Sequence, residues 1–252
     1  MSEKMVLSTS LLIAYENMAS NPRLYHKKYK RLMKVLSLPY KTNKKQLIEA
    51  KVQGLNDNTY QRLLPQLQHA ADRDYSLDIL ATNTQFKVIL TEEENVTLPY
   101  VYYRSPFLSN QLTINLTPTE SREQVRKYLQ LLCSNATKVT ICDNYFAEGW
   151  ESTQSLFISI LPKHSLKIEY VETPDSINAV KNSSKMTNDF VQEIHEQWSI
   201  SVSPLYHGSH DRYLLIESPQ GTLEVMISSG FTHLWKANPK EITCIIKVIE
   251  KP

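Results

Sequence analysis

The residues whose types and spacing best suit chemistry lie near the end of the chain. His210, Asp211 and Arg212 are consecutive, and the apolar run YLLI and then Glu217 follow them. Side chains two positions apart on a strand face the same side, so His210 and Arg212 would address one phosphate together. Arg212 would hold two phosphate oxygens with its planar fork, and His210 would attack the phosphorus or donate a proton. The alternatives are that these residues hold a phosphate without cleaving it, or that they only begin a strand.

Three further residues are candidates for contact with the same phosphate. Asp143 directly follows the run KVTIC, which predicts a buried strand, and an α/β sheet forms its binding crevice at such carboxyl ends. Asp143 is therefore expected either to line the site or to cap the turn that follows. Ser228 and Ser229, which precede Gly230, would offer a hydroxyl or a backbone N–H group to the phosphate.

The order of these residues resembles the phospholipase D superfamily pattern H-x-K-x4-D with a later glycine and serine pair. It is most similar to the single-copy H-D-R variant, found in the C-terminal domain of microtubule-interacting-and-trafficking (MIT) proteins and in many bacterial proteins. The run ATKVTICDNYFAEGW also resembles the opening strand and turn of such domains. The resemblance covers about residues 120–250. It departs from the pattern at Arg212, which replaces lysine, and at Glu217, which replaces aspartate.

The resemblance implies a metal-independent phosphodiesterase, most simply a nuclease, whose catalytic residues are His210, Arg212 and Glu217. In this family one histidine becomes a transient phosphohistidine and a second one protonates the leaving group. Because the chain has one motif, the resemblance implies a homodimer that brings two His210 side chains together. Bacterial relatives often look like parts of defence systems, which implies antiviral defence and a protein partner in a multi-component system. The alternative is a catalytically inactive phospholipase D-like module that recognises phosphate groups, nucleic acid or a partner protein, as the MIT relatives do.

No metal and no cofactor are predicted. His207 has no cysteine or carboxylate at metal-ligand spacing, and His233, in the run FTHLW, either covers the site or is a surface residue. With five glycines in the chain, a glycine-rich nucleotide-binding loop is absent. The three cysteines have no paired spacing and are expected to be buried, reduced thiols.

Positive charge is concentrated at the start of the chain. Residues 1–70 contain twelve Lys and Arg against four Asp and Glu, although the net charge of the whole chain is only +2. Such asymmetry indicates contact with a nucleic acid or another polyanion, and a solvated lysine-rich helical face is the alternative. The candidate nucleic-acid-binding residues are Lys27, Lys28, Lys30, Arg31, Lys44 and Lys45.

The pattern of elements predicts an α/β protein in three segments. Residues 1–72 are expected to form a basic helical module that resembles a small winged-helix module, with Asn21 and Pro22 starting one helix. Residues 73–118 are expected to form a small antiparallel sheet that serves as a connector or wing. Residues 119–252 alternate helix and strand and are expected to form a phospholipase D-like layered sandwich with a mixed sheet. Its first helix would carry the apolar stripe Val125, Tyr128, Leu129 and Leu132, after a capping box at Thr117 and Glu120.

Localisation is predicted from absent signals. No apolar run reaches the ~18 residues that a membrane-spanning helix requires. The first residues show no signal-peptide pattern, so the chain is expected in the cytoplasm.

Overall fold

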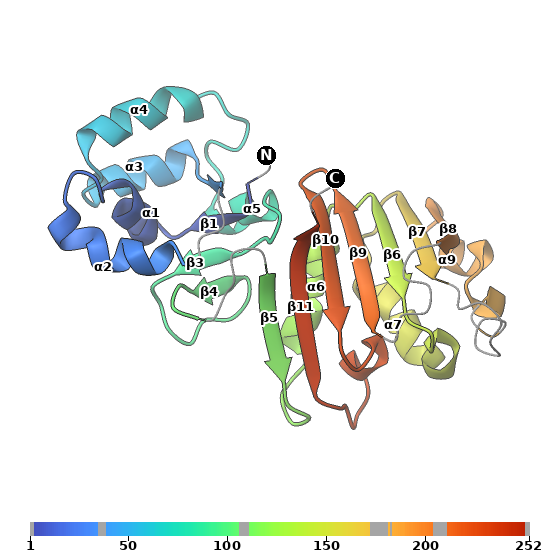
Figure 1. The fold of residues 1–252 in the computed structure, drawn as a ribbon. Coiled ribbons are helices and arrows are strands. Elements are labelled where there is room, and N and C mark those ends of the chain that lie inside the picture. The colour runs from blue at the N-terminus through green and yellow to red at the C-terminus, as the bar shows by residue number, and fades with distance from the viewer. Residues whose placement is uncertain are drawn as a thin grey trace. The chain divides into compact units, whose positions relative to one another are not determined.

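The structure is a computed structural model, and it describes residues 3–34, 39–105, 111–171, 181, 183–203 and 211–249. The chain divides into two compact units, Met1–Asn110 and Gln111–Pro252, here called unit 1 and unit 2 (Figure 1). Each unit combines a β-sheet with helices, so the prediction of an α/β protein is confirmed. Within the described residues, no helix is long and apolar enough to cross a membrane.

Unit 1 is built on a four-stranded sheet in the order β2-β1-β3-β4, in which every neighbouring pair is parallel. Its strands are β1 (Met5–Leu7), β2 (Tyr40–Lys41), β3 (Ile89–Thr91) and β4 (Tyr100–Tyr102). The two central strands, β1 and β3, are buried at every residue and apolar except for Thr91, as expected of parallel strands covered on both faces.

Asparagine and serine side chains start most of the helices of unit 1. These helices are α1 (Thr9–Glu16), α2 (Pro22–Leu32), α3 (Lys44–Val52), α4 (Asp57–Leu67) and α5 (Leu77–Thr82). Asn21, Asn43 and Asn56 each accept a hydrogen bond from the backbone N–H three residues later, which satisfies an unpaired donor of the first turn. The predicted start of α2 at Asn21 and Pro22 is therefore confirmed.

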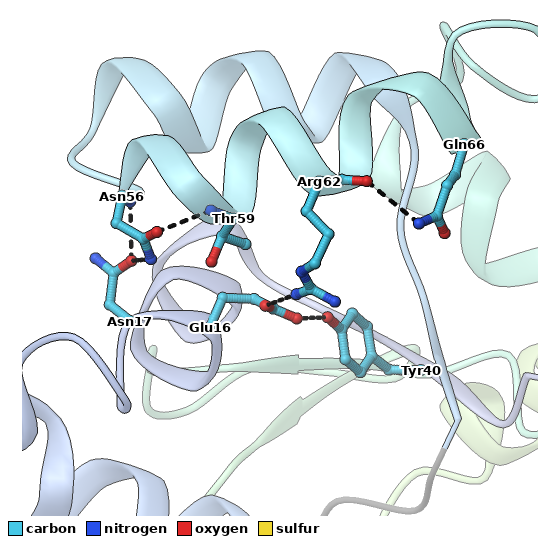
Figure 2. A network of polar contacts seen from close by, with 7 residues as sticks. All are labelled: Glu16, Asn17, Tyr40, Asn56, Thr59, Arg62 and Gln66. Atoms are coloured by element: carbon cyan, nitrogen blue, oxygen red, sulfur yellow. Dashed lines mark hydrogen bonds and ion pairs between the residues drawn. The ribbon is translucent and has the colours of Figure 1, made fainter.

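A polar network fixes α4 to the rest of unit 1 (Figure 2). The Glu16 carboxylate, at the end of α1, accepts a hydrogen bond from the Tyr40 hydroxyl. It also forms an ion pair with Arg62, whose guanidinium donates to it at 2.8 Å. Burial and the neighbouring Glu16 carboxylate raise the pKa of Tyr40 far above its usual range. Asn17 Oδ1 accepts from the backbone and the side-chain amides of Asn56, at 2.9 and 2.7 Å. These bonds make Glu16 a structural residue, since both of its oxygens contact neighbouring elements.

Three expectations for the first 118 residues differ from the structure. The helical module expected over residues 1–72 contains β1 and β2, which are only three and two residues long. Residues 73–110 belong to the same unit, and their strands β3 and β4 pair in parallel instead of forming an antiparallel sheet. The next strand, β5, pairs with a strand of unit 2. Such short strands are stabilised by partners distant in sequence, so helix signals dominate the local pattern.

Unit 2 is built on a seven-stranded mixed sheet in the order β5-β11-β10-β9-β6-β7-β8. Its strands are β5 (Gln111–Leu116), β6 (Lys138–Cys142), β7 (Leu166–Val171), β8 (Trp198–Ser203), β9 (Arg212–Ser218), β10 (Gly221–Ile227) and β11 (Ile242–Ile249). The pairs β6–β7 and β7–β8 are parallel, and the other four pairs are antiparallel. Figure 1 shows α6 and α7 behind this sheet.

The first helix of unit 2 carries the predicted apolar stripe. The helices of this unit are α6 (Glu123–Cys133), η1 (Phe146–Gly149), α7 (Trp150–Ser159), α9 (Asn188–Ile194) and η2 (Phe231–Leu234). The predicted stripe of Val125, Tyr128, Leu129 and Leu132 is buried. The prediction of a capping box is wrong. Glu120 accepts a hydrogen bond from the Thr117 backbone N–H in a separate turn, and α6 begins only at Glu123. Cys133, Cys142 and Cys244 are buried and form no disulfide, as predicted.

Candidate functional site

The strands β6, β9 and β10 bring three of the predicted segments together at one end of the unit 2 sheet. Tyr213 on β9 pairs with Cys142, the last residue of β6, and Arg212 pairs with Ile227, the last residue of β10. Asp143 therefore follows β6 beside the start of β9, and the turn Ser228–Gly230 follows β10 beside Arg212. We call Asp143, Arg212 and the turn Ser228–Gly230 the Arg212 end.

Asp143 and Arg212 form the charged pair of the Arg212 end. Arg212 Nε lies 3.8 Å from Asp143 Oδ1, and the two side chains are 22% and 3% exposed. The Tyr145 backbone N–H donates to Asp143 Oδ1 at 3.0 Å, and the Arg212 guanidinium carbon lies 5.2 Å from the centre of the Tyr145 ring. A buried carboxylate requires a cation and hydrogen-bond donors, and this arrangement supplies both. The guanidinium is thereby oriented at a partly open surface.

Gly230 lets the backbone of the turn approach this pair closely. Its φ angle is +86°, in the region that favours glycine. A Cβ atom at this position would lie 3.4 Å from Asp143 Oδ2 and 3.5 Å from Arg212 Nε. The position therefore requires glycine for its conformation, and any side chain would extend towards the charged pair.

Ser228 and Ser229 hold the turn in place through their hydroxyls. Ser228 Oγ accepts from the Thr243 backbone N–H at 3.0 Å, and Ser229 Oγ donates to the Glu241 carbonyl at 2.7 Å. Both contacts lead to the start of β11 and the residues before it. Contact between these serines and a phosphate stays a prediction.

Glu217 lies away from the Arg212 end. It pairs in register with Lys138, at the opposite end of β6 from Asp143, and the Lys138 ammonium contacts Glu217 at 3.2 Å and Glu169 at 3.1 Å. Burial opposes the charge on Lys138, but its bonds to the two carboxylates outweigh this effect and raise its pKa. Glu217 is five positions after Arg212 on the strand, which corresponds to about 17 Å. The structure thus places Glu217 in an ion-pair cluster outside the site.

His233 is a residue of this region whose burial the sequence did not indicate. It is 7% exposed, so the expectation of a surface residue is wrong, and its Nδ1 accepts from the Lys240 backbone N–H at 3.1 Å. Burial lowers its pKa, and the charges of Lys236, Lys240, Arg212 and Arg122 lower it further. Its neighbours Phe231 and Leu234 are buried apolar residues of the same turn, which is the local signal for burial of His233.

The two other histidines of the motif region, His207 and His210, lie outside the described residues. The catalytic role of His210 therefore stays a prediction from the sequence. Among the described residues, no group of three or more His, Cys, Asp or Glu side chains has the arrangement of a metal site.

The predicted nucleic-acid-binding residues of unit 1 do not form one site. Lys27, Lys28 and Arg31 of α2 line an open hollow of about 570 Å³, together with Leu24, Tyr103 and Arg104. We call this the α2 hollow. Lys45, at the start of α3, lines a different hollow that also contains Glu49 and Asp78. Lys30 and Lys44 line neither of the two hollows.

No family model and no curated protein matches the chain. Among solved structures, a polyphosphate kinase from Porphyromonas gingivalis is similar over 55% of this chain, with 12% sequence identity and a TM-score of 0.27. The matched part is 23% of the length of that kinase. A likeness at this level determines neither the fold nor the function of the chain.

Proposed function

We propose that the chain is a metal-independent phosphodiesterase that acts on a nucleic-acid backbone, with the scissile phosphate held at the Arg212 end. The observation that carries this proposal is the meeting of Asp143, Arg212 and Gly230 at one end of β6, β9 and β10. A guanidinium oriented by a buried carboxylate and a ring offers paired N–H donors to phosphate oxygens. Gly230, which lacks a side chain, leaves room for a phosphate beside that guanidinium.

The proposed reaction uses His210, two residues before Arg212 in the sequence. Its imidazole nitrogen attacks the phosphorus, and the bond from phosphorus to the leaving oxygen breaks as the phosphohistidine forms. The His210 of a second copy donates a proton to that leaving oxygen and then takes a proton from the water that hydrolyses the phosphohistidine. Arg212 offsets the charge that develops on the phosphate oxygens.

Asp143 acts in this proposal by positioning Arg212. The carboxylate is almost fully buried and lies beside a cation that is partly exposed. Because Asp143 and Tyr145 orient the guanidinium before the substrate arrives, less rotamer entropy is lost on binding.

The test is cleavage of single- and double-stranded DNA and RNA, and of a chromogenic phosphodiester, in EDTA. The wild-type chain is compared with His210→Ala, Arg212→Ala and the control Arg126→Ala, which removes an arginine of α6 with a similar intermediate exposure. We expect activity in EDTA, a loss of about 100-fold or more in the first two variants, and no change in the control. Cleavage that requires an added metal, or that persists in His210→Ala, would contradict the mechanism.

A second candidate function is phosphate recognition without cleavage. It is favoured by the position of Glu217, which pairs with Lys138 instead of supporting the Arg212 end. In this case none of the substrates is cleaved, while phosphate-containing ligands still bind and Arg212→Ala weakens their binding. The same four proteins therefore distinguish an enzyme from a binding module.

A further inference from the structure

The α2 hollow is an accumulation of positive charge in unit 1 that the chemistry at the Arg212 end does not use. Helix α2 carries five Lys and Arg residues and no Asp or Glu, and Leu32 is its only buried residue. Among the residues that the structure describes, only Lys28 of these cations has a carboxylate partner, Glu92, at 2.6 Å. Most of the charge of the helix is therefore available to an anion from solution.

The segment after β4 supplies the other wall of the α2 hollow. The Arg31 guanidinium donates to the Arg104 carbonyl at 3.2 Å, which joins this segment to α2. Arg104 Nε in turn donates to the hydroxyl of the buried Tyr103 at 3.0 Å. These bonds hold Arg104 beside the lysines of α2, although 73 positions separate it from Arg31. The hollow also lies at the carboxyl end of parallel strands, since Glu92 directly follows β3 and Tyr103 directly follows β4. Open α/β sheets bind ligands at such edges.

We propose that the α2 hollow binds the phosphate backbone of a nucleic acid. Arg23, Lys27 and Arg31 are four residues apart and follow one side of the helix, so their column is about 12 Å long. A single phosphate would contact only one turn of this column, whereas a chain of regularly spaced phosphates would contact all of it. The cations thus fit a repeating polyanion.

The same surface does not suit a lipid membrane. A helix that lies in a membrane interface needs a continuous apolar face opposite its basic face. Of the residues that line the α2 hollow, Leu24 is the one apolar side chain with large exposure, at 65%. The buried Tyr103 offers no ring for insertion between acyl chains. Nucleic acid is therefore the class of ligand that the hollow fits.

The experiment measures the affinity of the full chain for fluorescent single-stranded DNA and RNA by anisotropy in EDTA. The test variant is Lys27→Gln/Arg31→Gln. The matched control, Lys51→Gln/Arg73→Gln, removes the same charge from the same unit outside the hollow, at two cations that already pair with Asp57 and Asp74. His210→Ala is introduced into every protein so that the probe is not cleaved during titration.

We expect the test variant to lose about tenfold or more in affinity near physiological salt, because two phosphate contacts are removed. The slope of log affinity against log salt falls by about 1.4 in the same variant, because each phosphate contact of a single strand contributes about 0.7, and the control changes affinity less than about threefold. Equal losses in the two variants, or no loss in the test variant, would overturn the proposal. So would a test variant that loses affinity only for vesicles of anionic phospholipid.

This proposal is independent of cleavage at the Arg212 end, and the two fail separately. A chromogenic phosphodiester is too small to contact the α2 hollow, so Lys27→Gln/Arg31→Gln with His210 intact should turn it over at the wild-type rate. If the wild-type chain cleaves nothing but binds nucleic acid through Lys27 and Arg31, the enzyme proposal is wrong and the hollow proposal stands. If cleavage occurs and the hollow variant binds normally, the reverse holds.

Discussion

The α2 hollow and the Arg212 end use positive charge in opposite ways. The hollow gathers Lys27, Lys28, Arg31 and Arg104 around an open surface, where Lys28 pairs with Glu92 and Glu94 interacts with the charge of Arg104. The Arg212 end has a single arginine, which is oriented by a buried carboxylate, a ring and a turn whose glycine has a positive φ. The first arrangement provides attraction, and the second provides orientation.

This difference predicts which unit determines affinity and which determines rate. Exposed cations gain affinity by releasing counterions from a polyanion, and salt weakens this gain. A partly buried and oriented cation interacts more strongly with a single phosphate, because less water screens it. Substrate capture should therefore depend on unit 1 and salt, whereas turnover should depend on unit 2 and geometry.

The largest expected effect is that of salt. If four phosphates of a single strand contact the α2 hollow, raising salt from about 50 to about 200 mM lowers the affinity about 50-fold. Turnover of the chromogenic phosphodiester should change less than about twofold over the same range, because it depends on the oriented Arg212. Anisotropy and initial rates measure the two quantities. If both fall by the same factor, the two sites do not differ as described.

The next effect is on the packing that supports the Arg212 end. Gly149, at the end of η1, approaches η2 so closely that a Cβ atom would lie 2.5 Å from Thr232 Cγ2. Gly149→Ala should lower the stability of unit 2 by about 2 kcal/mol, because a methyl group is forced into a filled space. All three tryptophans lie in unit 2, so the denaturation midpoint of tryptophan fluorescence measures this loss.

Two variants serve as controls for Gly149→Ala. In Gly149→Ala/Thr232→Ala the clashing Cγ2 is absent, and most of the stability should return. Lys27→Ala, at the exposed α2 hollow, should change stability by less than about 0.5 kcal/mol. If Gly149→Ala is as stable as the wild type, η1 and η2 move apart without cost. The Arg212 end would then be less rigid than its contrast with the open α2 hollow requires.

The third effect separates backbone strain from damage to the site. Gly230 and Gly54 both have positive φ, and the space around Gly54 is open, whereas Gly230 faces Asp143 and Arg212. Each alanine variant should lose about 1–3 kcal/mol of stability, which is the cost of holding a residue with a Cβ atom at a positive φ. Only Gly230→Ala should also lower cleavage, by about tenfold, because it displaces the oriented guanidinium. Initial rates and circular dichroism melting measure both properties, and equal activity in the two variants would count against a phosphate beside Gly230.

Local signals in the sequence predicted the parts of this comparison that depend on neighbours in the chain. The Asn21 cap, the apolar stripe of α6 and the position of Asp143 at a carboxyl strand end each depend on residues a few positions apart.

The parts that the sequence did not predict depend on distant partners. Strand β1 pairs with β3 across more than 80 residues, and its three residues are too few to show a period. Arg104 reaches the α2 hollow from 73 positions away, where Arg31 donates to its carbonyl. Glu217 follows the expected motif spacing, yet the register of β9 against β6 places it beside Lys138. Pairing between elements, and not local pattern, determines these three positions.

The smallest expected effect is a pH dependence of unit 2 that arises from the cations around His233. Burial and the charges of Lys236, Lys240, Arg212 and Arg122 keep the pKa of His233 in the folded chain below its usual value of 6.5. The neutral imidazole therefore contributes its full stability above pH 6.5. As pH falls below 6.5, the unfolded chain takes up the proton first, and stability is lost until the folded pKa is passed.

The non-titrating variant His233→Asn tests this dependence, since its side-chain oxygen can still accept from the Lys240 backbone. Fluorescence-monitored urea unfolding between about pH 7 and pH 5 should show a smaller loss of stability in His233→Asn than in the wild type. Lys236→Gln removes an exposed cation and should bring the pKa of His233 closer to 6.5, so its loss should be intermediate. If the wild type and both variants lose stability equally, solvent screens the cations around His233 as strongly as it screens the exposed cations of the α2 hollow. The contrast between an enclosed and an open cationic site would then be wrong at this end of the sheet.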